Sequence, residues 1–341
     1  MVFPRKIIVR LALFVGLTVV VILTVLAYHQ LSTPQRVALA VPSATAAKIS
    51  FFALGDQGTG QFDQWRVARS MENVAEKTGD LDFVILLGDN FYRDGIQSTE
   101  DRQWNWKFEN MYSGTKLATI PFYSVLGNND VRGNGEAQIQ YSRDQAGSGR
   151  WQMPGHYYSK DFGLDNGHPL LRVVFVDSNL LTPESMAKQL RFIEEAFAPS
   201  ATQATWRIVV AHHRIRNAGH HGETEALVTT LLPVLQKGHV DFYLAGHDHD
   251  QQLIVRDGEP YYVISGGGGQ SLHMVSKGQE GLLFGKSQHG FARTVVDSSR
   301  MTIDFYDDDG QMAVGYAVRR SCTEPASACL KQTMAPTTSK E

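Results

Sequence analysis

LLGDNFYRDG, residues 86–95, holds an apolar run that stops abruptly at Gly88–Asp89, with a tyrosine, Tyr92, three residues further on. The run begins earlier, as DFVILL (82–87), and its short, aromatic and β-branched character predicts a buried strand. A carboxylate directly after such a strand, with a phenol close behind it, lies where ligands bind in open α/β sheets, at the carboxyl end of a strand. The stretch therefore predicts both a strand and part of a site.

Similar runs recur along the chain and predict an α/β architecture. The other predicted buried strands are ISFFAL, PFYSVL, LRVVFV, RIVVA and DFYLA. Amphipathic stretches between them predict helices over 62–77, 100–111, 184–197 and 223–236. After residue 250 the pattern changes to LIVR, YYVIS, ARTVVD, RMTIDFYD and MAVGYAVR, with turns at Asp257–Gly258 and Asp309–Gly310. This later pattern is typical of antiparallel hairpins, so we expect one domain with two sheets.

The composition favours a small-molecule ligand. The 341 residues carry a net charge of -3, and the pI is about 6.5. No general basic field exists that would attract nucleic acid, so we expect no nucleic-acid partner. The oligomeric state is not indicated by the sequence.

The first thirty residues predict a membrane anchor or a signal segment. Basic residues near the N-terminus precede 18 uncharged, mostly apolar residues, 11–28, which is just long enough for a membrane-spanning helix. A cleaved signal usually has a shorter apolar region, although Ala38-Leu39-Ala40 and VPSATAA (41–47) offer cleavage sites. A buried core helix is the remaining alternative. Because basic residues stay inside, the rest of the chain is expected outside the cytoplasm, periplasmic or extracellular, and secreted if cleavage occurs.

The remaining chain divides into a linker (31–47), a domain (48–320) and a C-terminal tail (321–341). The two cysteines, Cys322 and Cys329, lie in this tail. In an oxidising compartment they can close a small loop, but they can equally remain free thiols, and the sequence leaves both readings open.

Five of the six predicted buried strands end in residue types that bind metals. The strand ends are Gly55–Asp56, Gly88–Asp89, Gly127–Asn128, His212–His213 and Gly246–His247–Asp248–His249. Each has a structural alternative, because Asp or Asn after a strand can cap a helix and a lone His is often structural. Five together at one sheet edge predict a metal site. The glycines allow tight bends close to an ion.

At this point the sequence resembles the calcineurin-like metallophosphoesterases and, within them, the purple acid phosphatases of the tartrate-resistant type. The matching motifs are GDQG at 55, GDNFY at 88, GNND at 127, VVAH at 209 and GHDH at 246. The likeness continues in GNGEAQIQYS and YYVISGGGG and spans roughly residues 50–320. It implies an α/β (α+β sandwich) fold in which two mixed β-sheets pack face to face and are flanked by helices.

The resemblance also implies a dinuclear metal centre. The implied ligands are Asp56, Tyr92 and His249 on Fe(III), Asn128, His212 and His247 on a divalent Fe, Zn or Mn ion, and Asp89 bridging the two. Donor chemistry agrees, since hard oxygens and a phenolate suit Fe(III) whereas imidazoles suit softer divalent ions. The phenolate of Tyr92 should colour the protein. Such a centre lowers the pKa of bound water, and the resulting hydroxide attacks a phosphate monoester in line.

The leaving alkoxide still needs a proton, and the family assigns this work to two histidines. One is present here as His221, with His220 beside it, whereas Asn129 stands where the family has the other histidine. An amide cannot act as a general acid, whose loss costs about 10²- to 10⁴-fold in rate. Alternatively, Asn129 keeps a polar contact and the metals supply most of the rate.

The expected function is therefore an acid phosphatase acting on small phosphate monoesters, most active at acidic pH. The sequence leaves two alternatives. One is a phosphodiesterase acting on nucleotides or lipid head groups. The other is a metal- and phosphate-binding protein without activity, because Asn129 has replaced a histidine.

Overall fold

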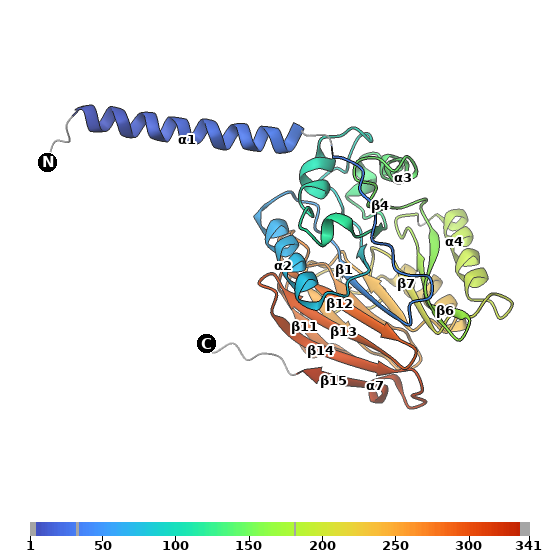
Figure 1. The fold of residues 1–341 in the computed structure, drawn as a ribbon. Coiled ribbons are helices and arrows are strands. Elements are labelled where there is room, and N and C mark those ends of the chain that lie inside the picture. The colour runs from blue at the N-terminus through green and yellow to red at the C-terminus, as the bar shows by residue number, and fades with distance from the viewer. Residues whose placement is uncertain (1–4, 32–33, 181, 335–341) are drawn as a thin grey trace.

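The computed structural model describes residues 5–31, 34–180 and 182–334. Its centre is a pair of mixed β-sheets that pack face to face (Figure 1). In sheet order, the first contains β15 (Leu330–Met334), β14 (Met312–Arg319), β13 (Arg300–Asp307), β12 (Gly290–Asp297), β1 (Lys48–Leu54), β2 (Phe83–Leu86), β3 (Phe122–Ser124) and β4 (Trp151–Gln152). The second contains β11 (Leu282–Lys286), β9 (Gln251–Ile254), β10 (Tyr261–Ser265), β8 (Phe242–Ala245), β7 (Trp206–Val210), β6 (His168–Phe175) and β5 (Tyr158–Asp165).

Apart from the N-terminal helix, the helices flank the two sheets. The α-helices are α1 (Arg5–Leu31), α2 (Phe62–Thr78), α3 (Gly135–Arg143), α4 (Pro183–Ala196), α5 (Glu225–Thr230), α6 (Leu232–Lys237) and α7 (Ala326–Cys329). Short turns of other helix types occur at η1 (Asn105–Glu109), η2 (Leu117–Thr119) and η3 (Asp130–Arg132). Strand residues alternate between the layers: Val173 of β6 joins the core between the sheets, whereas Val174 packs with Ile193 of α4 and Leu235 of α6.

The predicted strands and sheets are confirmed. β1, β2 and β3 pair in parallel, as do β6, β7 and β8, so each sheet has a parallel half. The two predicted hairpins are antiparallel, with Asp257–Gly258 between β9 and β10 and Asp309–Gly310 between β13 and β14. The second sheet is mixed because β10 pairs in parallel with β8 and antiparallel with β9. The first sheet is mixed because β1 pairs in parallel with β2 and antiparallel with β12.

Two of the four predicted helices need correction, whereas α2 and α4 form as expected. Residues 100–111 are helical only over 103–109, and η1 within this range is a π-helical turn instead of a regular α-helix. There the Trp104 ring stacks on Tyr141, and the Lys107 ammonium donates to the Tyr92 carbonyl. The helix expected over 223–236 is divided into α5 and α6 next to Pro233, which lacks a backbone N–H and starts a new helix instead. Helix α3 was not predicted.

The C-terminal segment is more ordered than the expected tail. Cys322 and Cys329 form a disulfide, which resolves the alternative that the sequence left open. The disulfide joins the turn after β14 to the last residue of α7. The chain then returns as β15 to pair with β14. Residues 330–334 therefore extend the first sheet.

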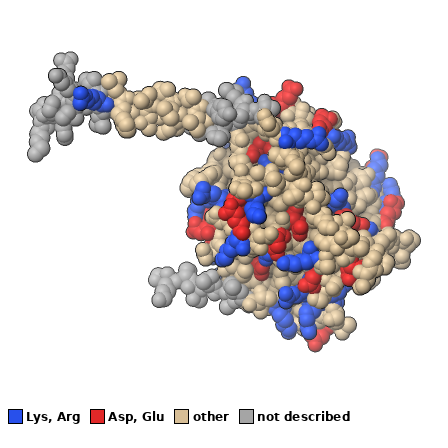
Figure 2. All heavy atoms as spheres, viewed as in Figure 1, with Lys and Arg blue, Asp and Glu red and all other residues tan. Residues whose placement is uncertain are grey.

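The N-terminal helix α1 covers the apolar segment and stands away from the two sheets (Figure 1). Within the ranges that the structure describes, no helix combines the length and the apolar character needed to cross a membrane. The membrane anchor predicted over residues 11–28 is not supported by this finding. On the face shown in Figure 2, basic and acidic side chains lie beside one another over the domain.

Candidate metal centre

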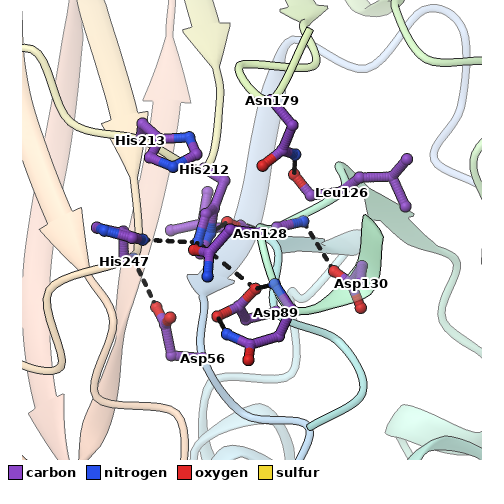
Figure 3. A network of polar contacts seen from close by, with 12 residues as sticks. Asp56, Asp89, Leu126, Asn128, Asp130, Asn179, His212, His213 and His247 are labelled. Carbon is purple, nitrogen blue, oxygen red and sulfur yellow. Dashed lines mark hydrogen bonds and ion pairs between the residues drawn. The ribbon is translucent and has the colours of Figure 1, made fainter. Parts of the chain in front are cut away.

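The carboxyl ends of five strands from both sheets meet at one place, as the sequence predicted. β1, β2 and β3 of the first sheet, and β7 and β8 of the second, all lead into the loops drawn in Figure 3. Potential ligand atoms of Asp56, Asp89 and His212 lie within 4.8 Å of one another, and all three residues are buried. The site is thus built where the edges of the two sheets come together.

One half of the site contains the three residues expected to bind Fe(III). The Tyr92 hydroxyl donates to Asp56 Oδ1 at 3.0 Å and lies 3.3 Å from His249 Nε2. His249 Nε2 is 3.6 Å from the same Asp56 oxygen. A carboxylate, a phenol and an imidazole therefore present their donor atoms to a common point.

The other half contains the three residues expected around the divalent ion. His212 Nε2 is 3.0 Å from Asn128 Oδ1 and 3.1 Å from His247 Nδ1. Asp89 Oδ1 lies 3.6 Å from His212 Nε2, so this carboxylate adjoins the second group as well as Asp56 (Figure 3). Asp89 therefore lies next to both groups of candidate ligands.

Backbone contacts fix the imidazole tautomers. His212 Nδ1–H donates to the Leu87 carbonyl at 2.8 Å, and His249 Nδ1–H donates to the Ser271 carbonyl at 2.7 Å. In each ring the lone pair is then on Nε2, the atom that faces the other candidate ligands. Outer hydrogen bonds of this kind are typical of metal-binding histidines.

The ligand residues themselves adopt strained backbone conformations. Asp56, Asp89 and His247 have φ values of 61°, 55° and 69°, in the left-handed region that non-glycine residues rarely adopt. From the sequence, the unusual backbone conformations were expected at the neighbouring glycines instead. Those glycines mainly permit close approach: a Cβ on Gly127 would lie 2.2 Å from Asp89 Oδ1, and one on Gly246 would lie 2.6 Å from Asp56 Oδ2.

The electrostatics of the site match a set of metal ligands. Burial and the Asp89 charge raise the pKa of Asp56 well above its usual value, and burial and Asp56 do the same for the pKa of Tyr92. Burial lowers the pKa of His249 to about 4 and also lowers the pKa of His247. Buried carboxylates and a phenol, next to imidazoles that favour the neutral form, require a cation to become fully ionised. The donor set therefore fits two metal ions.

Asp130 joins two of the ligand-bearing loops. Its carboxylate accepts hydrogen bonds from the backbone N–H groups of Asn90 at 3.0 Å, Phe91 at 3.1 Å and Gly127 at 2.8 Å. These loops carry Asp89 and Asn128. Asp130 is fully buried, and its pKa is raised to about 7 by burial and by the Asp89 charge.

The loop after β6 supports the site from the other side. Its residues were not among the predicted site residues. Asp177 follows β6, and its carboxylate accepts hydrogen bonds from Asn179 N–H and Nδ2. Asn179 Nδ2 also donates to the Leu126 carbonyl at 3.0 Å, next to the Asn128 loop (Figure 3). Ser178 Oγ lies 2.8 Å from His213 Nδ1. The polar run that follows the strand, DSN at 177–179, is the feature of the sequence that could have indicated this supporting role.

His156 makes the stability of this supporting loop depend on pH. Hydrogen bonds to Asp177 at 2.7 Å and Glu136 at 2.6 Å raise the pKa of His156 to about 9. A raised pKa stabilises the fold fully below the unfolded value of about 6.5, and this contribution is lost as pH rises through about 9. We expect thermal unfolding scans of His156→Gln to show a smaller fall in midpoint between about pH 7 and 10 than the wild type. His168→Gln, at an exposed position on β6, is the control, and an equal fall in all three proteins would contradict the assignment.

Asn129 is engaged with the candidate bridging carboxylate. Its backbone N–H donates to Asp89 Oδ1 at 2.7 Å, and its side-chain Nδ2 donates to Asp89 Oδ2. Its Oδ1 accepts from Arg132 at 2.9 Å. The amide that replaces the expected histidine therefore orients Asp89.

His221 lies beside the second group of ligands, and His220 lies further out. His221 Nδ1 is 3.1 Å from Asp248 Oδ1, and its ring centre is 4.6 Å from that of His247. The His220 and His221 ring centres are 5.0 Å apart, and both residues are exposed. His273, which was not among the predicted site residues, also approaches Asp248. No motif marked this position.

Comparisons with known proteins agree with the geometry. The calcineurin-like phosphoesterase family matches residues 49–251. Purple acid phosphatase 7 of Arabidopsis thaliana is 33% identical over 303 residues, covering 83% of this chain and 89% of the relative. Tartrate-resistant acid phosphatase type 5 of Mus musculus is 30% identical over 296 residues, covering 79% of this chain and 90% of the relative.

A solved structure also shares the fold. A purple acid phosphatase from seeds of yellow lupin (Lupinus luteus) superposes with a TM-score of 0.63 at 18% identity. The match covers 82% of this chain and 55% of that one. At this identity the likeness shows the fold alone.

Proposed function

Because the chain belongs to the calcineurin-like phosphoesterases and, within them, to the purple acid phosphatases, we propose that it hydrolyses small phosphate monoesters at the site described above. The observation that carries the proposal is the convergence of Asp56, Asp89 and His212 from three separate strand ends into one buried cluster. The test is hydrolysis of an aryl phosphate by the full-length protein loaded with iron and zinc.

We assign the metal ligands as the resemblance implied. Asp56, Tyr92 and His249 would hold Fe(III), Asn128, His212 and His247 would hold a divalent Fe, Zn or Mn ion, and Asp89 would be shared by the two. The close approach of Tyr92 to Asp56 and His249 supports the first group. The approach of His212 to Asn128 and His247 supports the second.

The two ions, when bound, supply an activated water and the positive charge that the phosphoryl group requires. The protein's own groups orient this machinery and handle the proton of the leaving group. Asn129 holds both oxygens of Asp89 in place. His221 donates a hydrogen bond from Nδ1 to Asp248, which directs Nε2 away from that carboxylate. In its protonated form His221 then gives the Nε2 proton to the departing alkoxide.

Restoring the missing histidine tests how far Asn129 limits the rate. We expect Asn129→His to raise kcat/KM for alkyl phosphates, whose alkoxides are poor leaving groups, by about 100-fold, the lower end of the range for a positioned general acid. Aryl phosphates should gain less, because their leaving oxygens need less protonation. Parallel assays of the two substrates on wild type and variant check this. Equal changes for both substrates would show that residue 129 supplies no proton.

The same preparation distinguishes the alternatives. A phosphodiesterase would cleave an aryl diester faster than the matching monoester. A protein disabled by Asn129 would bind both metals and phosphate without turnover. We expect faster cleavage of the monoester.

We also propose that the domain functions outside the cytoplasm. The Cys322–Cys329 disulfide supports this location, since such bonds persist mainly in oxidising compartments. Cell fractionation followed by N-terminal sequencing tests the location and shows whether residues 1–30 are retained. Recovery of the protein with reduced cysteines in the cytoplasmic fraction would contradict the proposal.

A further inference from the structure

Two imidazoles converge on one buried carboxylate beside the metal centre. Asp248 Oδ1 is 3.1 Å from His221 Nδ1 and 3.4 Å from His273 Nδ1. The other oxygen of Asp248 accepts from Asn217 Nδ2 and lies 3.5 Å from Arg214 Nε. Asp248 is fully buried, so these contacts hold it firmly. Its position between His247 and His249 places both imidazoles next to the metal ligands.

Each imidazole lies against a different ligand histidine. The His221 ring centre is 4.6 Å from that of His247, and the His273 ring stacks on His249 with centres 4.0 Å apart and an angle of 17°. By the assignment above, His247 and His249 bind different ions. His221 and His273 therefore flank both halves of the dinuclear centre, with their own ring centres 5.0 Å apart.

The backbone fixes the position of His273. Its N–H donates to the His249 carbonyl at 2.9 Å, and the His249 N–H donates to His273 Nδ1 at 3.3 Å. These two contacts join the loop after β10 to the loop after β8. His273 is thus held by the same residue that is expected to bind iron.

The His249 contact also determines which nitrogen of His273 carries a proton. Nδ1 accepts a hydrogen bond from the backbone N–H of His249, whereas its 3.4 Å approach to Asp248 Oδ1 is an ion-pair contact of the charged ring only, so the neutral ring carries its proton on Nε2. In the charged ring both nitrogens carry protons. Nε2 is therefore a donor in either state, and the His273 side chain retains 22% exposure.

We propose that His273 is a second substrate-binding histidine, whose Nε2–H donates a hydrogen bond to a phosphoryl oxygen of the monoester. The inference rests on the proposed function. It explains how the chain can function with Asn129 in place of a histidine, because the Asn129 amide is occupied by Asp89 and Arg132. The two proton-bearing imidazoles at the substrate would then be His221 and His273.

Binding of inorganic phosphate to the full-length, iron- and zinc-loaded protein, measured by isothermal titration calorimetry, tests the proposal. We expect His273→Leu to weaken phosphate binding by about 10- to 100-fold, as for loss of a hydrogen bond to a charged group. His273→Gln keeps an N–H near the position of Nε2 and should recover most of the affinity. His289→Gln is the matched control, because His289 Nε2 already contacts the Gln270 carbonyl at 3.0 Å. It should bind phosphate like the wild type.

Metal content and a second-site variant complete the experiment. All variants should retain two metals per chain, and Asn129→His in the His273→Leu background should restore part of the phosphate affinity. Wild-type phosphate affinity in His273→Leu would overturn the proposal. So would equal losses in the Leu and Gln variants with both metals retained, because the donated hydrogen bond would then be irrelevant.

Two further results separate this inference from other readings. A third metal equivalent that binds the wild type and is lost in His273→Leu would assign the cluster to a cation and overturn the proposal. Turnover of an aryl phosphate is measured on the same wild-type sample. Absent turnover with His273-dependent phosphate binding would contradict the enzyme function and support the binding role, whereas turnover with His273-independent binding would do the reverse.

Discussion

Asp89→Asn is expected to lower kcat/KM for an aryl phosphate by at least about 10³-fold, since loss of one preorganised electrostatic contact at a reacting centre already costs about 10²- to 10³-fold. Asp89 adjoins both groups of ligands, approaching His212 and accepting two hydrogen bonds from Asn129. An amide at this position loses the negative charge that a shared ligand needs. The purified variant should also contain fewer than two metals per chain.

The control for this prediction is Asp94→Asn, an exposed carboxylate in the same loop. It changes the charge by the same amount and should retain activity and metal content. Steady-state kinetics and elemental analysis of the three proteins give the result. Undiminished turnover in Asp89→Asn would exclude Asp89 as the bridging ligand.

Tyr92→Phe is expected to abolish the visible absorption band of the iron-loaded protein. Colour in this site requires a phenolate on Fe(III), and the Tyr92 hydroxyl is the phenol that approaches both Asp56 and His249. Burial and Asp56 raise the pKa of Tyr92, so only a strong Lewis acid can hold it as phenolate. The loss should be complete, because phenylalanine offers no donor atom.

Absorption spectra of iron-loaded wild type, Tyr92→Phe and Tyr157→Phe provide the measurement. Tyr157 packs against Phe192 of α4, away from the ligand-bearing loops, and its replacement should leave the band unchanged. Elemental analysis confirms that iron is bound in each sample. A band that persists in Tyr92→Phe would assign the colour to another group.

The convergence of the candidate ligands was predictable because it follows from local rules. A buried strand followed by Gly-Asp or by His is visible in the sequence, and parallel strands bring their carboxyl ends to one edge. Asp56 after β1 and His212 after β7 are distant in the chain, yet each was identified from its own strand. The break next to Pro233 also has a local cause, which the apolar periodicity of 223–236 concealed.

The supporting residues were less predictable because their roles depend on contacts across the chain. Nothing near Asn129 indicates that its amide binds Asp89, and nothing near His273 indicates that it stacks on His249. The same reason applies to 100–111, where the expected helix is shortened to 103–109 and Lys107 donates to the Tyr92 carbonyl. Such contacts form only when segments that are distant in the chain come together in the folded protein.

The most direct test of the dinuclear acid phosphatase is to measure metal content and aryl phosphate hydrolysis on one preparation of the full-length protein, between pH 4 and 8. We predict two metals per chain and clear turnover that is highest on the acid side. Two bound metals without turnover at any pH would contradict this account.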